Sequence, residues 1–168
     1  MRRIVFLPVF ILLIQSCIPI KSAPRIENYR ILEGRKFKKG LPPRQTFVFE
    51  DKQDVNAFYN FINDKFQLGD EQVMDDVPFR VNGHQYFFSF YEVDKKSKNI
   101  NLMPFIMSKV AKSEEVDEPE MDINEYYYIA IEAYSDIEND CLVMGALSRE
   151  PVLKYLRNLK EEYQNTKP

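Results

Sequence analysis

The chain of 168 residues is long enough for one domain with an ordinary hydrophobic core. Its 45% hydrophobic and 29% charged residues are typical of a globular protein and not of a disordered one. The net charge of −3 argues against a nucleic-acid binder, which needs a basic surface. The sequence has no zinc-type cysteine spacing, no glycine-rich phosphate loop and no internal repeat, so we expect no metal and no cofactor.

The N-terminus has the organisation of an export signal. A basic start, Met1-Arg2-Arg3, precedes an apolar run over residues 4–14. A helix of this length would span about 16 Å, which is too short for a bilayer core of about 30 Å. We therefore expect a signal peptide over residues 1–16 and not a membrane span.

The apolar run ends in a short motif, Leu13-Ile14-Gln15-Ser16-Cys17. It places an aliphatic residue three positions before a cysteine and a small residue directly before it. The motif resembles the lipobox of bacterial lipoproteins. The resemblance implies cleavage before Cys17, lipidation of this cysteine and attachment to a membrane of the bacterial cell envelope, with the protein facing the periplasm or the exterior. The alternative is an ordinary secretory signal, cut after Ser22 or Ala23, which would give a secreted protein.

Residues 17–43 are expected to form a tether between the lipid anchor and the domain. They are rich in proline and glycine, and their charges are mostly basic. We favour a solvated linker with a short strand near residues 29–32. The alternative is a basic arm that binds anionic lipid headgroups or an acidic partner.

A short strand over residues 46–49 should precede the first helix. Asp51 is expected to cap this helix, and apolar residues then recur at helical spacing up to Phe66. The acidic loop over residues 69–77 follows. It lacks the central glycine of a calcium loop, so we expect a solvated loop there.

Asn82-Gly83 lies between two runs rich in aromatic and β-branched residues, and it predicts a β-hairpin with a type I′ turn. With a two-residue loop the predicted cross-strand pairs are Val81 with His84, Phe79 with Tyr86 and Val77 with Phe88. One face of the hairpin is then nearly all apolar, so a helix must cover it. The next segment, residues 100–110, fits an edge strand better than a helix because Pro104 interrupts it, but both stay open.

Residues 113–148 contain no Lys or Arg. We expect the first third, through Asn124, to be a mobile acidic loop. A strand over residues 125–135, a turn over 136–140, a partner strand over 141–146 and a last helix that is capped by Ser148 should follow.

This order of elements predicts an α+β fold. Strands that follow one another through hairpin turns form an antiparallel sheet, and the helices before and after can cover one face of it. We expect one domain over residues 44–168, with a mainly antiparallel sheet of about five strands and two helices packed on it.

Two sets of side chains are candidate contacts for a partner. Clustered carboxylates would attract a basic protein, and tyrosines supply a large contact area at a low entropic cost. The candidate partner-binding residues are Glu114, Glu115, Asp117, Glu118, Glu120, Tyr126, Tyr128 and Tyr134. If a helix covers the tyrosine face, the same row belongs to the core.

We therefore expect a small lipid-anchored envelope protein that is not an enzyme and that binds a protein partner, for example an immunity protein or an accessory subunit. One alternative is a small hydrolase with Cys141 as nucleophile and His84 as base. No nucleophile elbow or metal motif accompanies this pair, and a buried structural cysteine is the commoner case. The other alternative is a glycan- or lipid-binding module that uses the aromatic faces.

Overall fold

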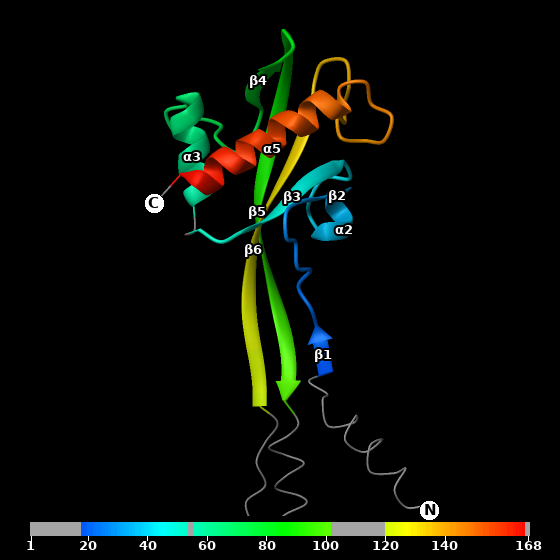
Figure 1. The fold of residues 1–168 in the computed structure, drawn as a ribbon, viewed down its shortest axis with the longest axis vertical. Coiled ribbons are helices and arrows are strands. Elements are labelled where there is room, and N and C mark those ends of the chain that lie inside the picture. Colours follow the sequence, from blue (N-terminus) through cyan, green and yellow to red (C-terminus); the bar gives the residue numbers. More distant parts are fainter. Residues whose placement is uncertain (1–17, 54–55, 102–119, 167–168) are drawn as a thin grey trace, which may run out of the picture. The chain divides into compact units, whose positions relative to one another are not determined.

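The computed structural model describes residues 18–53, 56–101 and 120–166 (Figure 1). The signal peptide, Cys17 and the candidate carboxylates from Glu114 to Glu118 lie outside these residues, as does most of segment 100–110. The chain divides into two compact units. Of the described residues, the larger unit holds 25–53, 56–94 and 127–166, and the smaller unit holds 18–24, 95–101 and 120–126.

The fold is α+β, as predicted, and its sheet has six strands. Besides β1 (Ile18–Lys21), the strands are β2 (Arg30–Glu33), β3 (Gln45–Asp51), β4 (Val77–Val81), β5 (His84–Asn101) and β6 (Glu120–Tyr134). Their order across the sheet is β4-β5-β6-β3-β2, and the β4–β5, β6–β3 and β3–β2 pairings are antiparallel.

The predicted hairpin is confirmed in its turn and in its register. Val81 pairs with His84, and the two other predicted pairs also form. Asn82 and Gly83 both have positive φ angles, 51° and 83°, which a type I′ turn requires. On the apolar face of the hairpin Val81 is half-buried and His84, beside the turn, is exposed, whereas the other members are buried: Val77, Phe79, Tyr86, Phe88 and Phe90.

Two helices cover this apolar face of the sheet, α3 (Ala57–Phe66) and α5 (Arg149–Asn165). In Figure 1, α5 crosses in front of the strands and α3 lies beside its C-terminal end, where Lys65 of α3 and Glu162 of α5 form an ion pair at 2.6 Å. The predicted apolar stripe of α5 is buried, and Lys160 is buried beside it; the stripe is Val152, Leu153, Leu156, Leu159 and Tyr163.

Aromatic rings hold the helices to the sheet. Phe58 of α3 meets Phe49 of β3, Phe90 of β5 and Tyr163 of α5, with ring centroids 5.8, 4.9 and 4.9 Å apart. All four rings are fully or almost fully buried. Edge-to-face contacts of this kind add to the free energy of burial, so Phe58 is the central side chain of the core.

The predicted helix start is wrong. Asp51 ends β3 and does not cap α3; the N-cap position is held by Asn56, with φ 66° and no hydrogen bond from its side chain to the helix. The sheet strand ends at Asp51 and the helix begins only at Ala57, a separation that apolar periodicity does not reveal.

The other face of the sheet is covered by a short helix, α2 (Gly34–Phe37), and the chain that follows it. The Phe37 ring stands edge-on to Tyr128 of β6 at 5.3 Å, and Phe37 and Leu41 are buried. The larger folded unit therefore begins at Arg25, and the expectation of a tether up to residue 43 is wrong for this part of the chain. The strand that we predicted near residues 29–32 is present as β2.

Residues 141–146 do not form the predicted partner strand of β6 but a succession of turns. The neighbours of β6 are β5 and β3, and Phe47 of β3 faces Ile131 of β6. Gly145 has a φ angle of 92° in these turns, which breaks the extended backbone that a strand requires.

In the smaller unit, β1 (Ile18–Lys21) pairs antiparallel with residues 98–100 of β5. β6 begins at Glu120, so the expected mobile loop is wrong for residues 120–124, which are strand. Lys96 and Glu125 form an ion pair across the two strands. Within the described ranges, no helix has the length and apolar character to cross a membrane.

Candidate functional site

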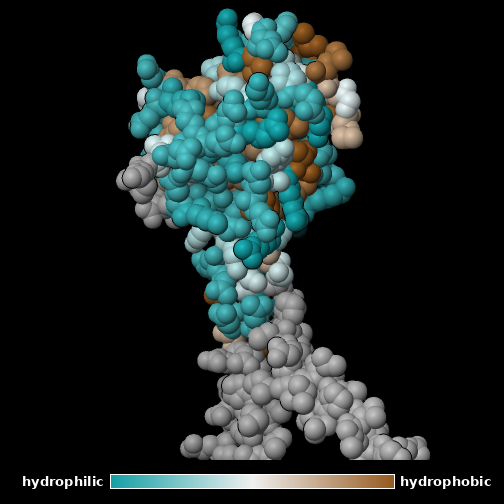
Figure 2. All heavy atoms as spheres, in the orientation of Figure 1, coloured by the Kyte–Doolittle hydropathy of each residue, from teal (hydrophilic) through white to brown (hydrophobic). Residues whose placement is uncertain are grey.

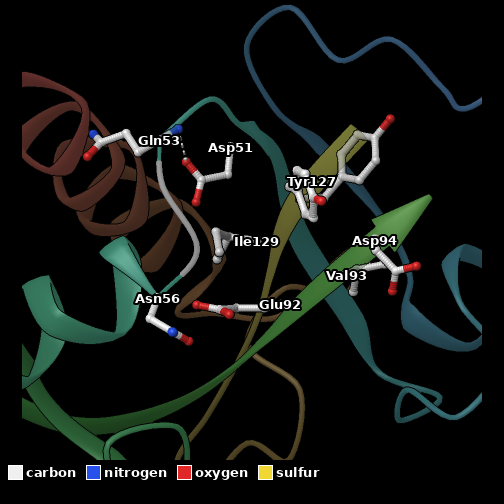
Figure 3. A pocket seen from close by; sticks show the side chains of 9 residues that line it. Asp51, Gln53, Asn56, Glu92, Val93, Asp94, Tyr127 and Ile129 are labelled. Carbon is white, nitrogen blue, oxygen red and sulfur yellow. Dashed lines mark hydrogen bonds between the residues drawn. The ribbon is translucent and has the colours of Figure 1, made fainter. Parts of the chain in front are cut away.

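A hollow of about 180 Å³ opens at the end of the helix-covered face of the sheet, in the larger unit (Figure 3). We call it the acidic cleft. Its lining residues are Asp51, Gln53, Asn56, Glu92, Val93, Asp94, Tyr127, Tyr128 and Ile129. Three carboxylates and two primary amides thus meet around one small volume.

Strand alternation explains how the carboxylates reach the cleft. Asp51 and Glu92 each lie two residues beyond a core phenylalanine, Phe49 and Phe90, and so lie on the same face of the sheet. The helices cover the phenylalanines but not the last residues of this face. The core thus ends in a row of acidic groups.

Asp51 is held in place by three hydrogen bonds. The hydroxyl of Tyr163 donates to both carboxylate oxygens, at 3.0 and 2.9 Å, and the backbone N–H of Gln53 donates to Oδ1 at 3.1 Å. Burial of the ring and the charge of Asp51 raise the pKa of Tyr163 well above its usual range, so this hydroxyl keeps its proton. The carboxylate of Asp51 is therefore held in one position.

Glu92 has no such support. Its carboxylate extends toward the amide of Asn56 in Figure 3, and among the described residues no ion pair or hydrogen bond to it is seen. Burial raises the pKa of Glu92, and the negative charge of Asp51 raises it further. The two carboxylates repel each other in the free protein.

The third carboxylate is partly compensated. Lys38 reaches Oδ1 of Asp94 at 3.3 Å and its carbonyl oxygen at 3.1 Å. Tyr127 keeps 43% of its surface exposed at the cleft. A cationic group in the cleft would meet Asp51 and Glu92 as charges, the amide oxygens as acceptors and the Tyr127 ring as an apolar or cation–π surface.

The predicted tyrosine row is divided by the structure. Tyr128 is only 1% exposed beneath Phe37, so it is a core residue and the expectation of a surface contact is wrong at this position. Tyr126 is half-buried. Tyr134 is also half-buried: its hydroxyl donates to Asp76, and the guanidinium of Arg44 lies 4.8 Å from its ring centre.

The predicted carboxylates are not brought to the cleft within the described chain. Of that group only Glu120 is described, as the first residue of β6. Asp136, Glu138 and Asp140, which alternate like metal ligands, instead lie in the loop after β6, where Glu138 and Asp140 accept hydrogen bonds from backbone N–H groups. In the described part of the chain no three His, Cys, Asp or Glu side chains are grouped so that they could hold a metal ion.

Cys141 is completely buried, and burial raises the pKa of its thiol, whereas a nucleophilic cysteine needs a lowered pKa. Its Sγ lies 3.8 Å from the carbonyl oxygen of Glu138. His84 is exposed beside the hairpin turn. The expectation that Cys141 is a small buried hydrophobic residue agrees with this burial.

Sequence reasoning missed Asp51 and Glu92. Asp51 lies where a helix cap is expected, and the predicted apolar face of the hairpin ends at Phe90. A signal was nevertheless present, because alternation places Glu92 on that apolar face, where a carboxylate is unusual.

The fold and the cleft together define an α+β protein with an acidic hollow at the end of an antiparallel sheet. Comparisons with protein-family models, with curated proteins and with solved structures give no match to this chain. Function has to be inferred from the site, because a fold of this class hosts many functions.

Proposed function

We propose that this protein is a lipid-anchored protein of the bacterial cell envelope that binds a basic protein partner, and that the acidic cleft receives a lysine or arginine side chain of that partner. The observation that carries the proposal is the pair Asp51 and Glu92, two carboxylates that line one hollow and to which no cation is paired in the described chain. Like charges in one site destabilise the free state, and an arriving cation removes that repulsion.

The amides of the cleft support a cationic guest. Gln53 donates its side-chain N–H to the carbonyl of Tyr163 at 3.0 Å, so its amide oxygen is left as an acceptor. Asn56 does not use its side chain to cap α3. Ammonium and guanidinium groups carry only donors, so they match a site that is rich in acceptors.

A titration with short basic peptides tests the cleft. The protein is the mature chain with Cys17→Ser, which lacks an acyl anchor, and the probes are tetra-arginine, tetralysine and tetraglutamate. We expect the two basic peptides to shift the NMR signals of Asp51, Asn56, Glu92 and Tyr127, and tetraglutamate to leave them unchanged. Glu92→Gln should weaken binding of the basic peptides at least about fivefold, the loss of ~1 kcal/mol expected for one charged contact.

The matched control is Glu161→Gln, which removes the same charge from an exposed position on α5. If both variants weaken binding equally, the peptides respond to net charge and the cleft is not their site. Shifts that are confined to other surfaces would also contradict the proposal.

The lipid anchor is tested separately. Cys17→Ser should abolish labelling of the chain by a fatty-acid probe and leave the precursor uncut. When the signal segment is removed from this variant, the remaining chain should no longer be bound to membranes. The result follows because only the thiol of Cys17 can accept the lipid in the motif Leu13-Ile14-Gln15-Ser16-Cys17. Unchanged processing in the variant would favour an ordinary secretory signal.

A further inference from the structure

The loop over residues 135–148, between β6 and α5, exposes large apolar side chains. Ile137, Met144 and Leu147 are 93%, 84% and 94% exposed, and Val143 is 43% exposed. We call this segment the apolar loop. Figure 2 shows hydrophobic atoms gathered at the upper right edge of the molecule, where Figure 1 draws the end of this connection.

The apolar loop is held rigidly. The carboxylate of Glu138 accepts the N–H of Leu147 at 2.8 Å, the N–H of Ser148 at 3.2 Å and the Ser148 hydroxyl. The hydroxyl of Ser135 accepts the N–H groups of Ile137 and Glu138. The loop therefore presents Ile137 and Leu147 to solvent through fixed backbone contacts and not through a lack of structure.

The middle of the loop is anchored as well. Asp140 accepts the N–H of Gln45 in β3 at 2.8 Å and that of Leu142 at 3.0 Å. Cys141 and Leu142 are buried in the core. Arg149 donates from Nε to the carbonyl of Leu142 at 3.2 Å. An ordered loop with exposed apolar side chains is a common form of protein docking site, because little entropy is lost on binding.

A hollow of about 610 Å³ lies beside the loop. The hairpin contributes His84 and Tyr86 to its lining, and the loop contributes Asp136, Ile137 and Leu147. This volume is large enough to take side chains of another protein. Two of the exposed apolar residues thus form the rim of a concave surface.

We infer that the apolar loop and the hollow beside it are a docking surface for a protein that offers an apolar socket with a basic rim. Charge decides the occupant. The loop carries Asp136, Glu138 and Asp140 and no Lys or Arg. An anionic membrane would repel these carboxylates, and a second copy would place the same acidic loop against itself. A basic rim complements them, and the exposed apolar side chains enter the socket.

This inference rests on residues that do not line the acidic cleft. The inference about the loop therefore stands even if the acidic cleft binds no cation. The proposal that the cleft binds a cation likewise stands even if the apolar loop binds no protein. Two surfaces on one small protein are compatible with one partner or with two.

Site-specific photo-crosslinking in cells that make the full-length chain tests the docking surface. A photoreactive amino acid replaces Leu147 in one variant and Asn158, an exposed polar residue of α5, in the matched control. We expect Leu147 and not Asn158 to crosslink to one protein, at an apolar patch that mass spectrometry finds beside lysine or arginine. Ile137→Ser with Met144→Ser should reduce the yield at least about tenfold, whereas Met121→Ser, an exposed apolar residue of β6, should not.

The remaining outcomes overturn the inference. They are an adduct between two copies of the chain, an adduct to lipid, the same proteins at Leu147 and Asn158, or no adduct at Leu147. The mature chain with Cys17→Ser, which lacks an acyl anchor, should not bind vesicles of phosphatidylcholine and phosphatidylglycerol; binding through Ile137 and Leu147 would mean that the loop docks on a membrane and not on a protein. Thermal melts of the serine variants should match the wild type because the exchanged side chains are exposed.

Discussion

Glu92 is a single carboxylate that the fold keeps in an unfavourable place. It follows Phe90 on the same face of the sheet, beyond the part that the helices cover, where it is exposed, and it shares the acidic cleft with Asp51. A group of this kind lowers the stability of the free protein, and natural proteins retain such groups where a ligand uses them.

Glu92→Gln should therefore stabilise the free protein near neutral pH while it weakens binding of basic peptides. The pKa of Glu92 is raised by burial and by Asp51, so the folded state favours the protonated carboxyl. The contribution of the protonated Glu92 carboxyl to stability is fully present below its ordinary pKa of 4.5. This contribution is lost as pH rises through the higher pKa of the folded state. Urea unfolding of both proteins between pH 4 and pH 8 measures this, and the difference should be below about 1 kcal/mol. A variant that is less stable at neutral pH would show that Glu92 is a structural residue.

The tyrosines of β6 show what one sequence cannot tell about a residue. Tyr128 and Tyr134 lie on the same face of the strand, yet Phe37 covers the first and leaves the second half-exposed. The covering residue is distant in sequence, in a segment that looks like a linker. Alternation predicts which side chains share a face, but not which part of a face another element covers.

At the scale of elements, the hairpin was predictable because its determinants are local. The dipeptide Asn82-Gly83 and the alternation on either side of it fix the turn and the register together. The stripe of α5 was predictable for the same reason. Residues 141–146 were not, because long-range hydrogen bonds, such as that from Gln45 to Asp140, hold an apolar sequence as turns. The acidic cleft depends on three separate strands, and no local pattern predicts their meeting.

Gly83→Val should destabilise the protein by more than about 1 kcal/mol, because a β-branched residue is strained at the positive φ of 83°. Apart from the two neighbouring residues of the chain, no atom lies within 4 Å of an added Cβ, so the loss would be conformational and not a clash with another part of the fold. Gly83→Asn is the control, since asparagine tolerates this conformation better. Thermal denaturation of the three proteins should order them as wild type, then Asn, then Val; equal melts would contradict a type I′ turn.

Glu138 of the apolar loop should make part of the free energy of unfolding depend on pH. Hydrogen bonds from Ser148 and from the Leu147 backbone lower the pKa of Glu138. Its contribution is present above the ordinary value of 4.5 and is lost as pH falls through the lower pKa of the folded state. Glu138→Gln should remove this part of the pH dependence and cost about 1–3 kcal/mol at neutral pH. The measurement is urea unfolding of both proteins from pH 3 to pH 7. The prediction is wrong if the variant loses stability at low pH as the wild type does.

At the scale of the whole molecule, the charge distribution should control the rate of association. Residues 113–148 carry many carboxylates and no basic residue, and such a segment raises the on-rate of a basic partner. Association with tetra-arginine should slow as salt rises from ~0.05 to ~0.3 M, because the Debye length shortens over this range. Stopped-flow fluorescence with a labelled peptide measures the rate.

Neutralising the five predicted carboxylates should reduce both the rate and its dependence on salt, and leave the melting temperature nearly unchanged. The residues to be changed to Gln or Asn are Glu114, Glu115, Asp117, Glu118 and Glu120. A strong loss of stability with an unaffected rate would mean that this segment pairs with the protein's own basic residues.

The position of β3 in the sheet has a consequence for how the chain reaches its fold. β3 lies between β2 and β6, and Phe47 pairs with Ile131, which is synthesised much later. Until then Phe47, Val48 and Phe49, all fully buried in the finished protein, are an uncovered apolar strand with one free edge. Contacts of such high sequence separation fold slowly, and an unpaired apolar edge aggregates. We expect the growing chain to need a chaperone to shield β3 until β6 has been made.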